Sequence, residues 1–366
     1  MRSTLSLLLV PAALVQAPLA AQAPPPAAPA RPISAPERLA ILDTLAKELK
    51  AKYVFPEIAE QVAVALLAKA KSGGYDAATT VAAFAEALSK DLRELGKDGH
   101  FRVRFDPRFK AETDEDKPPT KEELVQGRKE MASMAFGIER LERLPGNVGY
   151  VELRGFGPME FVGAAYTQAL SLLAGSEALI LDLRRNGGGS PESVAFLMSH
   201  FFPEGDSRHL NDLYNRPKNE TRQYWTDPSV GQRYTAPVYV LTSARTFSGG
   251  EECAYDFQTQ KRGILVCETT GGGANPGGPV ALGHGLVCFI PTSRAINPIT
   301  KTNWEHVGVK PDLAVPAADA LKTAYATILK DLIKKEKEPE DREQLEALLG
   351  RVEKGESEKP NYTPRR

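Results

Sequence analysis

Apolar residues recur at helical spacing in three stretches near the start of the chain. These stretches occupy residues 39–49, 58–66 and 81–92. Apolar positions three or four residues apart lie on one face of a helix, so each stretch predicts an amphipathic helix. Pro56 separates the first two stretches, and Gly73 and Gly74 precede the third. The pattern therefore predicts a small N-terminal helical domain over residues 35–96.

A different pattern follows Pro145, where short apolar runs alternate with helical stretches. Strands are predicted at residues 147–153, 178–183, 238–242, 264–267 and 285–290, and helices at 161–173, 191–201 and 249–260. This alternation is typical of α/β layers joined by crossover connections. We therefore expect a layered α/β domain over residues 97–330. Its connecting segment, 97–140, contains a polar stretch at 112–129 that predicts a surface loop or strap.

Both ends of the chain lie outside these patterns. Arg2, an apolar run and small residues up to Ala23 have the layout of a secretory signal peptide. We expect a signal peptide at residues 1–23, a Pro/Ala-rich linker at 24–34, and export to the periplasm or the extracellular space. An uncleaved anchor helix is the alternative, but Pro11 and Pro18 interrupt a run shorter than the roughly 20 apolar residues that span a bilayer. Residues 331–366 form a charged tail, either a marginal helix or disordered.

Charge and cysteine content narrow the possible partners. The 366 residues include 46 Lys and Arg and 47 Asp and Glu, so no bulk positive field exists to attract nucleic acid. The three cysteines, Cys253, Cys267 and Cys288, lack the C-x-x-C spacing of a zinc ribbon or dithiol site. The five histidines are scattered and H-E-x-x-H is absent. We expect no metal ion, no organic cofactor, no nucleic-acid partner and no stable membrane insertion.

Three consecutive glycines, Gly187 to Gly189, directly follow the strand predicted at 178–183. Glycines let backbone N–H groups converge on an anionic oxygen because no Cβ blocks the approach. A phosphate-binding loop is the rival interpretation, but neither G-x-x-x-x-G-K-[ST] nor G-x-G-x-x-G fits here. A purely structural turn is also possible, with Ser190 as the N-cap of the next helix and Pro191 as its first residue.

Ser248 precedes a predicted helix, where free backbone N–H groups and the helix dipole favour negative charge. Such a position suits acyl transfer. However, Ser248 and Glu251 also match the S-x-x-E capping box, and this segment alone favours capping over catalysis. Thr246 stands where the G-x-S-x-G elbow of α/β-hydrolases has glycine, and no S-x-x-K motif occurs in the chain.

A nucleophilic serine needs a base, and histidine is the natural candidate. His100 follows the turn residues Asp98 and Gly99 and precedes an alternating strand pattern, which would expose its ring at a strand edge. His200 lies in an apolar helix and is interpreted as a core or surface residue. Glu305 lies beside a tryptophan in a loop rich in turn residues, where it either orients an imidazole or is simply solvated.

Several segments, taken in order, resemble one family. They read LDLR before the triple glycine, TFSGGEE at 246–252, ETTGGGA at 268–274, and NWE at 303–305 followed by GVKPD. These look like the tail-specific, C-terminal-processing serine peptidases of family S41, in the branch shared with the interphotoreceptor retinoid-binding protein repeats and the tricorn core. The resemblance spans residues 39–329. It implies a ClpP/crotonase-like α/β fold with a small N-terminal helical domain.

By position, the resemblance implies Ser248 as nucleophile, His100 as general base and Glu305 as the acid that orients the base. The N–H groups of Gly249 and of the glycine loop, with Gly188 as the expected member, would form the oxyanion hole. The better-known members activate serine with a downstream lysine, but no lysine occurs between Arg262 and Lys301. Gly99 stands where the tricorn-type site has serine, and Asn275 stands where related sequences often have histidine. The residues between His100 and Pro145 are too few and too polar for a separate PDZ-like segment.

We therefore expect an exported serine peptidase that cleaves peptide or protein substrates through an acyl-enzyme. Two alternatives come from another class of function: a non-catalytic module that binds hydrophobic ligands, and a scaffold whose helical domain docks a partner. The combination of Ser248, His100 and Glu305 favours the peptidase, because ligand binding alone requires none of the three.

Overall fold

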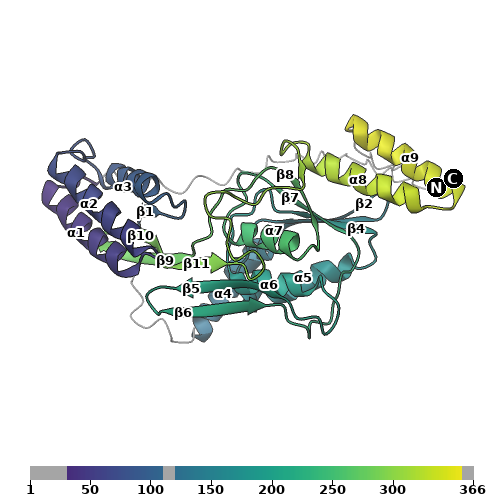
Figure 1. The fold of residues 1–366 in the computed structure, drawn as a ribbon, viewed down its shortest axis with the longest axis horizontal. Helices are drawn as coiled ribbons and strands as arrows, with labels where there is room; N and C mark the ends of the chain where they lie inside the picture. Colours follow the sequence, from purple (N-terminus) through teal and green to yellow (C-terminus); the bar gives the residue numbers. More distant parts are fainter. Residues whose placement is uncertain (1–30, 110–119, 357–366) are drawn as a thin grey trace, which may run out of the picture.

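The computed structural model describes residues 31–109 and 120–356. The segment expected to be a signal peptide and residues 24–30 of the expected linker lie outside these residues. The described chain is elongated, with helices at both ends and three β-sheets between them (Figure 1). No helix in the described ranges combines the length and the apolar composition needed to cross a bilayer.

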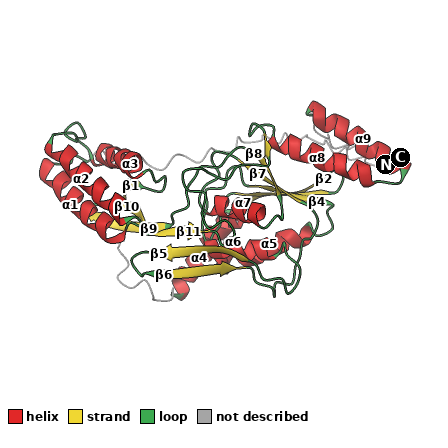
Figure 2. Ribbon diagram, viewed as in Figure 1, coloured by secondary structure: helices red, strands yellow, loops and turns green. Residues whose placement is uncertain are grey.

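Three helices form one end of the molecule: α1 (Ala35–Lys52), α2 (Pro56–Lys71) and α3 (Val81–Gly96). Ser34 begins α1 in a reciprocal capping box with Glu37. The helices share a core with a sheet of order β1-β10-β9, made of β1 (Arg102–Phe105), β10 (Leu286–Pro291) and β9 (Gly277–Gly283). The strand predicted at 285–290 does form, and it lies in the sheet that these helices cover (Figure 2).

A six-stranded sheet with the order β12-β8-β7-β4-β3-β2 forms the centre of the molecule. Its strands are β2 (Ile138–Leu144), β3 (Val148–Leu153), β4 (Ala178–Asp182), β7 (Val238–Thr242), β8 (Ile264–Cys267) and β12 (Leu313–Ala314). All neighbouring pairs are parallel except β2 with β3. Strands β3, β4 and β7 are buried along their whole length, as expected for a sheet with both faces covered.

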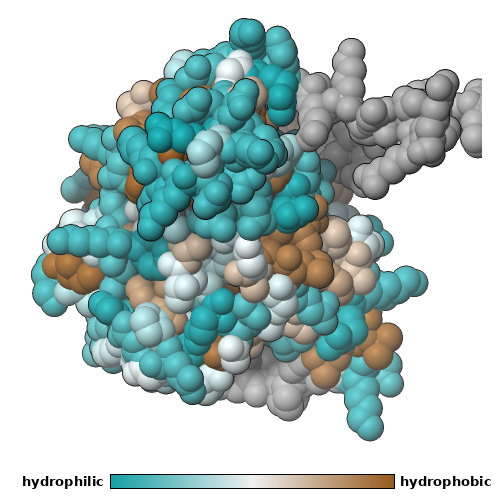
Figure 3. All heavy atoms as spheres, turned by 90° about the vertical axis from the view of Figure 1, so that its right-hand side faces the viewer, coloured by the Kyte–Doolittle hydropathy of each residue, from teal (hydrophilic) through white to brown (hydrophobic). Residues whose placement is uncertain are grey.

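Helices cover each face of this sheet. One face packs against α5 (Met159–Leu172), α6 (Pro191–Ser199) and α7 (Gly249–Thr259). The other face packs against α8 (Ala320–Lys335), on which α9 (Pro339–Lys354) lies. The charged C-terminal segment thus forms a helix, and Leu345, Leu348 and Leu349 contact the core below α8. The side of the molecule that presents α8 and α9 is mainly hydrophilic, with separate hydrophobic patches (Figure 3).

Two parts of the fold differ from the sequence-based expectations. A third sheet has the order β11-β5-β6 and contains β5 (His209–Asn215), β6 (Glu220–Trp225) and β11 (Ser293–Ile296). The apolar pattern predicts none of these strands. Strand β6, for example, is largely exposed. Helix α4 (Lys121–Ser133) starts within the polar stretch expected as a loop or strap, at a capping box between Thr120 and Glu123. A short turn, η1 (Ala135–Gly137), joins α4 to β2. No residue of α4 is buried, so the capping residues rather than a hydrophobic face mark this helix.

Candidate active site

Ser248 lies on the short turn between β7 and α7 and adopts a strained backbone conformation. Its φ is 53° and its ψ is −123°, a region that residues with a Cβ rarely occupy. Such strain costs on the order of 1–3 kcal/mol and is concentrated at functional sites. The α/β-hydrolases carry their nucleophile on a similarly strained strand-to-helix turn. The backbone therefore has that kind of turn although the G-x-S-x-G sequence is absent.

Glu251 fixes the start of α7 and the turn before it. The N–H of Ser248 donates to Oε2 of Glu251 at 2.9 Å, and the N–H of Glu251 donates to the backbone carbonyl of Ser248 at 2.8 Å. The same carboxylate accepts from the N–H groups of Gly272 and Gly273, at 2.6 and 2.8 Å. Burial raises the pKa of Glu251, and these hydrogen bonds act in the opposite direction. The capping acid expected from the sequence therefore also joins the serine turn to the GGGA loop.

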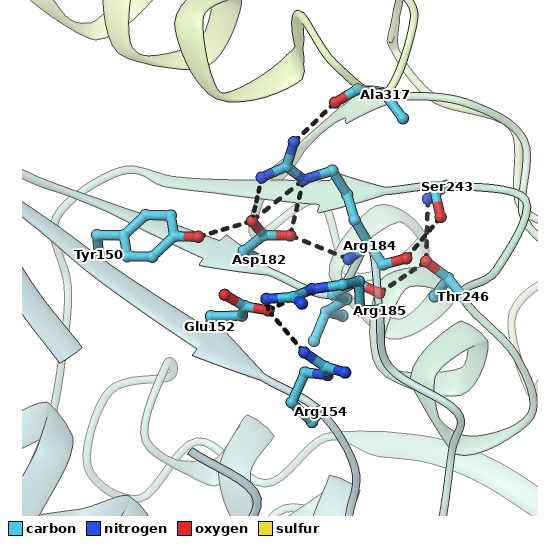
Figure 4. A network of polar contacts seen from close by, with 10 residues as sticks. Tyr150, Glu152, Arg154, Asp182, Arg184, Arg185, Ser243, Thr246 and Ala317 are labelled. Carbon is cyan, nitrogen blue, oxygen red and sulfur yellow. Dashed lines mark hydrogen bonds and ion pairs between the residues drawn. The ribbon is translucent and has the colours of Figure 1, made fainter. Parts of the chain in front are cut away.

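Side-chain hydrogen bonds hold the serine turn against the end of β4 (Figure 4). The Thr246 hydroxyl donates to the carbonyl of Leu183 at 2.8 Å and accepts from the N–H of Ser243 at 2.9 Å. The Ser243 hydroxyl donates to the carbonyl of Arg184 at 2.6 Å. Because all these groups are buried or half-buried, the turn that carries Ser248 is locked to the strand that leads into the glycine loop.

A buried carboxylate anchors that strand end. Asp182 accepts from the Tyr150 hydroxyl at 2.8 Å and from Nε of Arg184 at 3.0 Å (Figure 4). Pairing with Asp182 raises the pKa of Arg184, while burial raises the pKa of Tyr150. Nη1 of Arg184 also donates to the carbonyl of Ala317, just before α8, at 2.7 Å. The ion pair is therefore satisfied by further hydrogen bonds, as a buried pair needs to be.

The glycine loop lies directly against Ser248. A Cβ at Gly188, where φ is 100°, would be 2.7 Å from Cβ of Ser248, so only glycine fits. The N–H of Gly188 donates to Oδ1 of Asn186 at 2.8 Å, and Nδ2 of Asn186 donates to the carbonyl of Leu153 at 3.0 Å. The next glycine of the loop lies close to the residue after Ser248, because a Cβ on Gly249 would be 3.0 Å from the Gly189 nitrogen.

His100 lies between α3 and β1, and its ring packs against Phe247 with ring centroids 4.6 Å apart. Its side chain is 9% exposed. In the described part of the chain, neither ring nitrogen has a hydrogen-bond partner. Buried polar atoms without partners are unfavourable and are therefore rare in folded proteins. The imidazole is thus available for a further hydrogen bond.

Two carboxyl groups lie beside His100. Oδ1 of Asp98 is 3.4 Å from Nδ1 of His100, and donor atoms of Asp98, His100 and Glu305 all lie within 4.8 Å of one another. The N–H of Ala274 donates to Oε2 of Glu305, whose Oε1 has no hydrogen-bond partner among the described residues. Burial, followed by the nearby charge of Asp98, raises the pKa of Glu305 to about 8. A metal ion could use this donor set, but the three groups also form an acid–base site.

Ser248 and His100 line the same cleft, which has a volume of about 910 Å³. Gly187, Gly189 and Phe289 also line it. The structure therefore brings the serine turn, the glycine loop and His100 together, with Glu305 beside His100. His306 lies next to Glu305, with Nδ1 3.6 Å from Oε1, but its side chain is 56% exposed.

The other histidines lie elsewhere. His200 is buried in the core, where Nε2 is 3.0 Å from the Thr167 hydroxyl, and His209 pairs with Asp212. His284 lies 3.3 Å from Glu37 at the helical end. Of the five histidines, His100 and His306 are therefore those near Glu305.

Sequence reasoning missed three polar side chains that support these groups: Asp98, Asn186 and Asn275. Local signals for two of them exist. Asp98 precedes His100 by two residues, and at this spacing an aspartate side chain commonly accepts the backbone N–H of the second residue. The N–H of His100 donates to Oδ1 of Asp98 at 3.0 Å. Asn186 precedes Gly188 by the same spacing. Asn275 has no such local signal, because its Nδ2 donates to Oδ2 of Asp98 across 177 residues.

Two family models match the chain. Peptidase family S41 matches residues 147–315, and the model described as the N-terminal domain of peptidase S41 in eukaryotic IRBP matches residues 36–136. Together the two matches span most of the chain in the order expected from the resemblance. The chain belongs to peptidase family S41.

Two curated relatives match parts of the chain. The tail-specific protease of Haemophilus influenzae is 31% identical over 97 residues, which are 26% of this chain and 13% of that protein. The chloroplastic carboxyl-terminal-processing peptidase 1 of Arabidopsis thaliana is 23% identical over 190 residues, which are 52% of this chain and 38% of that protein. The chain thus spans well under half the length of either relative.

Solved structures share the fold. A putative peptidase from Parabacteroides merdae is similar with a TM-score of 0.55 and 17% identity, over 80% of this chain and 96% of that chain. Mature CPAF is similar with a TM-score of 0.54 and 12% identity, over 81% of this chain and 96% of that chain. The α/β fold class with a small N-terminal helical domain is therefore confirmed.

The raised pKa of Glu305 predicts a pH dependence of stability. The pKa rises from 4.5 to about 8, so the folded protein holds this proton more tightly than the unfolded chain. The resulting stability is fully present below pH 4.5 and is lost as the pH rises towards 8. Glu305→Gln should remove this loss. Relative to wild type, we expect its free energy of unfolding to gain up to about 1.4 kcal/mol per pH unit across this window, measured by urea denaturation.

Glu123→Gln is the control for this measurement. Glu123 is an exposed capping carboxylate whose pKa is lowered by its hydrogen bonds to Thr120, so its replacement should give no such gain. Parallel stability–pH curves for wild type and Glu305→Gln would contradict the assignment of a raised pKa to Glu305.

Proposed function

We propose that this protein is a serine peptidase that hydrolyses peptide bonds in peptide or protein substrates. Ser248 is the nucleophile, His100 the general base, and Glu305 the acid that orients the base. The observation that carries this proposal is the strained Ser248 turn in the same cleft as a buried imidazole without hydrogen-bond partners. A helix cap alone requires neither the strain nor the imidazole.

The reaction proceeds through two acyl-transfer steps. His100 takes the proton from the Ser248 hydroxyl as its oxygen attacks the scissile carbonyl carbon, which produces a tetrahedral intermediate. The C–N bond then breaks, and the proton passes from His100 to the leaving amine. Water attacks the resulting acyl-enzyme in the same way, with His100 again as base, and releases the carboxylic acid product and free Ser248.

The oxyanion of each intermediate is stabilised by backbone N–H groups. The N–H of Gly249 opens α7, where the helix dipole also favours negative charge. The glycine loop supplies the second donor, and Gly188 is the residue expected by position. In this conformation the N–H of Gly188 donates to Asn186. Gly188 can donate to the oxyanion only after this hydrogen bond breaks on substrate binding. The adjacent Gly189 is the alternative donor.

Glu305 orients His100 from the loop that follows β11. Asn303 accepts the N–H of Glu305 at 2.9 Å, and Nε1 of Trp304 donates to the carbonyl of Gly273 at 2.8 Å. These bonds hold the carboxyl group beside the imidazole. Glu305 limits the rotation of the ring and stabilises its charged form during the attack.

We infer further that the protein is exported to the periplasm or the extracellular space. The signal-peptide layout of residues 1–23 supports this inference. Expression of the full chain in a bacterial host should yield a periplasmic or secreted product whose N-terminus, determined by mass spectrometry, lies near Ala23. A cytoplasmic product that retains the first 20 or so residues would contradict export.

A non-catalytic, hydrophobic-ligand-binding module is the second candidate. The match of residues 36–136 to the N-terminal domain found in eukaryotic IRBP favours it. Binding of an apolar fluorescent ligand that is unaffected by replacement of Ser248, together with no peptidase activity in wild type, would support this candidate over the peptidase.

Replacement of Ser248 is the first test of the peptidase. Ser248→Ala should abolish hydrolysis of casein-derived peptides and labelling by a fluorophosphonate, while circular dichroism remains that of wild type. The physical reason is that alanine keeps the helix but removes the attacking oxygen. Mass spectrometry of labelled wild type should place the adduct on Ser248.

Ser34→Ala is a matched control, since Ser34 also begins a helix in an S-x-x-E capping box. This variant should lose about 1 kcal/mol of stability and keep wild-type activity. Hydrolysis by Ser248→Ala at the wild-type rate would refute the mechanism.

Replacement of the two histidines near Glu305 is the second test. His100→Ala should lower kcat/KM by about 10²–10⁴-fold because the proton of Ser248 then has no acceptor. His306→Ala should change kcat/KM by less than about threefold, since its ring is more than half exposed. Steady-state kinetics on one peptide substrate measures both. Loss of activity in His306→Ala with full activity in His100→Ala would reverse the assignment of the base.

A further inference from the structure

Asp98 is a fully buried carboxylate for which the proposed mechanism has no role. Oδ1 accepts the backbone N–H of His100 at 3.0 Å and lies 3.4 Å from Nδ1 of the same residue. Oδ2 accepts from Nδ2 of Asn275 at 3.0 Å and from the Tyr53 hydroxyl at 3.4 Å. Donors from three separate segments thus fix both oxygens, and one of these oxygens lies beside the imidazole.

The groups around Asp98 include one basic side chain. Among the described residues, His100 is the basic side chain that lies within 4.0 Å of the Asp98 carboxylate. Burial and the charges of Asp98 and Glu305 raise the pKa of Tyr53, so Tyr53 remains a neutral donor. Burial, followed by the charge of Asp98, raises the pKa of Glu305, so the two carboxyl groups beside His100 act on each other. An unpaired carboxylate in such a site is costly, and a protonated imidazole would offset that cost.

We propose that Asp98 is a positioning residue for His100: its carboxylate fixes the imidazole and stabilises the imidazolium, and Tyr53 and Asn275 hold that carboxylate in place. This inference rests on the proposed function, because it assigns a role at the same site. The proton that leaves the Ser248 hydroxyl goes to His100 and is returned to the leaving group, so Asp98 gains and loses no proton. Its negative charge acts only through the ring beside it.

Tyr53 makes the helical end of the molecule part of this site. It is the C-cap residue of α1, and its N–H donates to the carbonyl of Leu49 at 2.9 Å. Its ring packs against Phe101 with centroids 4.8 Å apart, next to His100 in the chain. The turn from Asp98 to Phe101 is therefore held by the packing of Tyr53 at the end of α1, as well as by the hydrogen bond between Asp98 and the His100 N–H.

Asp98→Asn is the central test, because it keeps the size of the side chain and removes its charge. We expect kcat to fall by at least about 100-fold with KM changed by less than about threefold. A fall in kcat with an unchanged KM separates a role at the reacting groups from a general loss of folding or of substrate binding. Titration with a fluorophosphonate counts the folded, competent sites, so that kcat refers to those sites alone.

Asp91 provides a matched control. It is a buried aspartate in the same helical region, and it accepts from the Tyr75 hydroxyl at 2.5 Å and from Nζ of Lys69 at 2.8 Å. Asp91→Asn removes the charge of a buried, tyrosine-bonded carboxylate that has no contact with His100. It should lower stability and leave both kcat per site and KM unchanged.

Two milder variants keep the inference testable if Asp98→Asn does not fold. Tyr53→Phe and Asn275→Ala each remove one donor to Asp98, and each should lower kcat per site by about three- to thirtyfold. Tyr75→Phe, which removes the equivalent donor to Asp91, should not lower it. The role of Asp98 would be overturned by wild-type kcat per site in folded Asp98→Asn. It would also be overturned by wild-type kcat per site in both milder variants.

The same measurements separate this inference from the peptidase proposal. Absence of peptidase activity and of Ser248 labelling in wild type would refute the peptidase itself. Activity and labelling that depend on Ser248 but not on Asp98 would leave the peptidase intact and refute the positioning role alone.

Discussion

The close approach of two backbone turns determines the architecture of the candidate site. The glycine loop and the serine turn come so near each other that a Cβ at Gly188 would be 2.7 Å from Cβ of Ser248. At Gly189 a Cβ would lie within 1.9 Å of the carbonyl oxygen of Phe156. Two of the three consecutive glycines are thus required by contact, and both adopt a positive φ. The strained conformation of Ser248 persists because buried hydrogen bonds around Thr246 and Asn186 hold both turns.

Buried carboxylates connect this pair of turns to the remaining parts of the site. Glu251 bonds the serine turn and the GGGA loop, and the Ala274 N–H at the end of that loop bonds Glu305. Asn275, the next residue, bonds Asp98, which lies beside His100. A chain of polar contacts therefore runs from Ser248 to the base through buried and partly buried groups. Burying such groups is costly, and some of their polar atoms have no partner among the described residues, as expected where position matters more than stability.

Local sequence patterns predicted the elements with continuous apolar runs. The strands at 238–242 and 264–267 are confirmed residue for residue, because each run is short and bounded by turn residues. Strand β6 escaped prediction, since most of its side chains are exposed and polar. Helix α4 also escaped, although its capping residues Thr120 and Glu123 are visible in the sequence. Apolar periodicity finds elements that bury a face and misses those stabilised by caps or by edge pairing.

The residues of the candidate site also fall into two groups: those that local sequence patterns indicate, and those that only long-range contacts bring together. Ser248 with Glu251 and the glycine loop are recognisable from contiguous residues, and the Asp98–His100 turn has a local spacing that was available but not used. The contacts of Glu305 with His100, and of Tyr53 and Asn275 with Asp98, join segments far apart in the chain. Only packing brings these together: β10 pairs with β1, and α1 covers that sheet. Because Tyr53 ends α1 and bonds the carboxylate beside the imidazole, removal of the helical end would take away a donor to Asp98. Arg93 of α3 also lines the cleft, so the small helical domain contributes to the site rather than being a separate appendage.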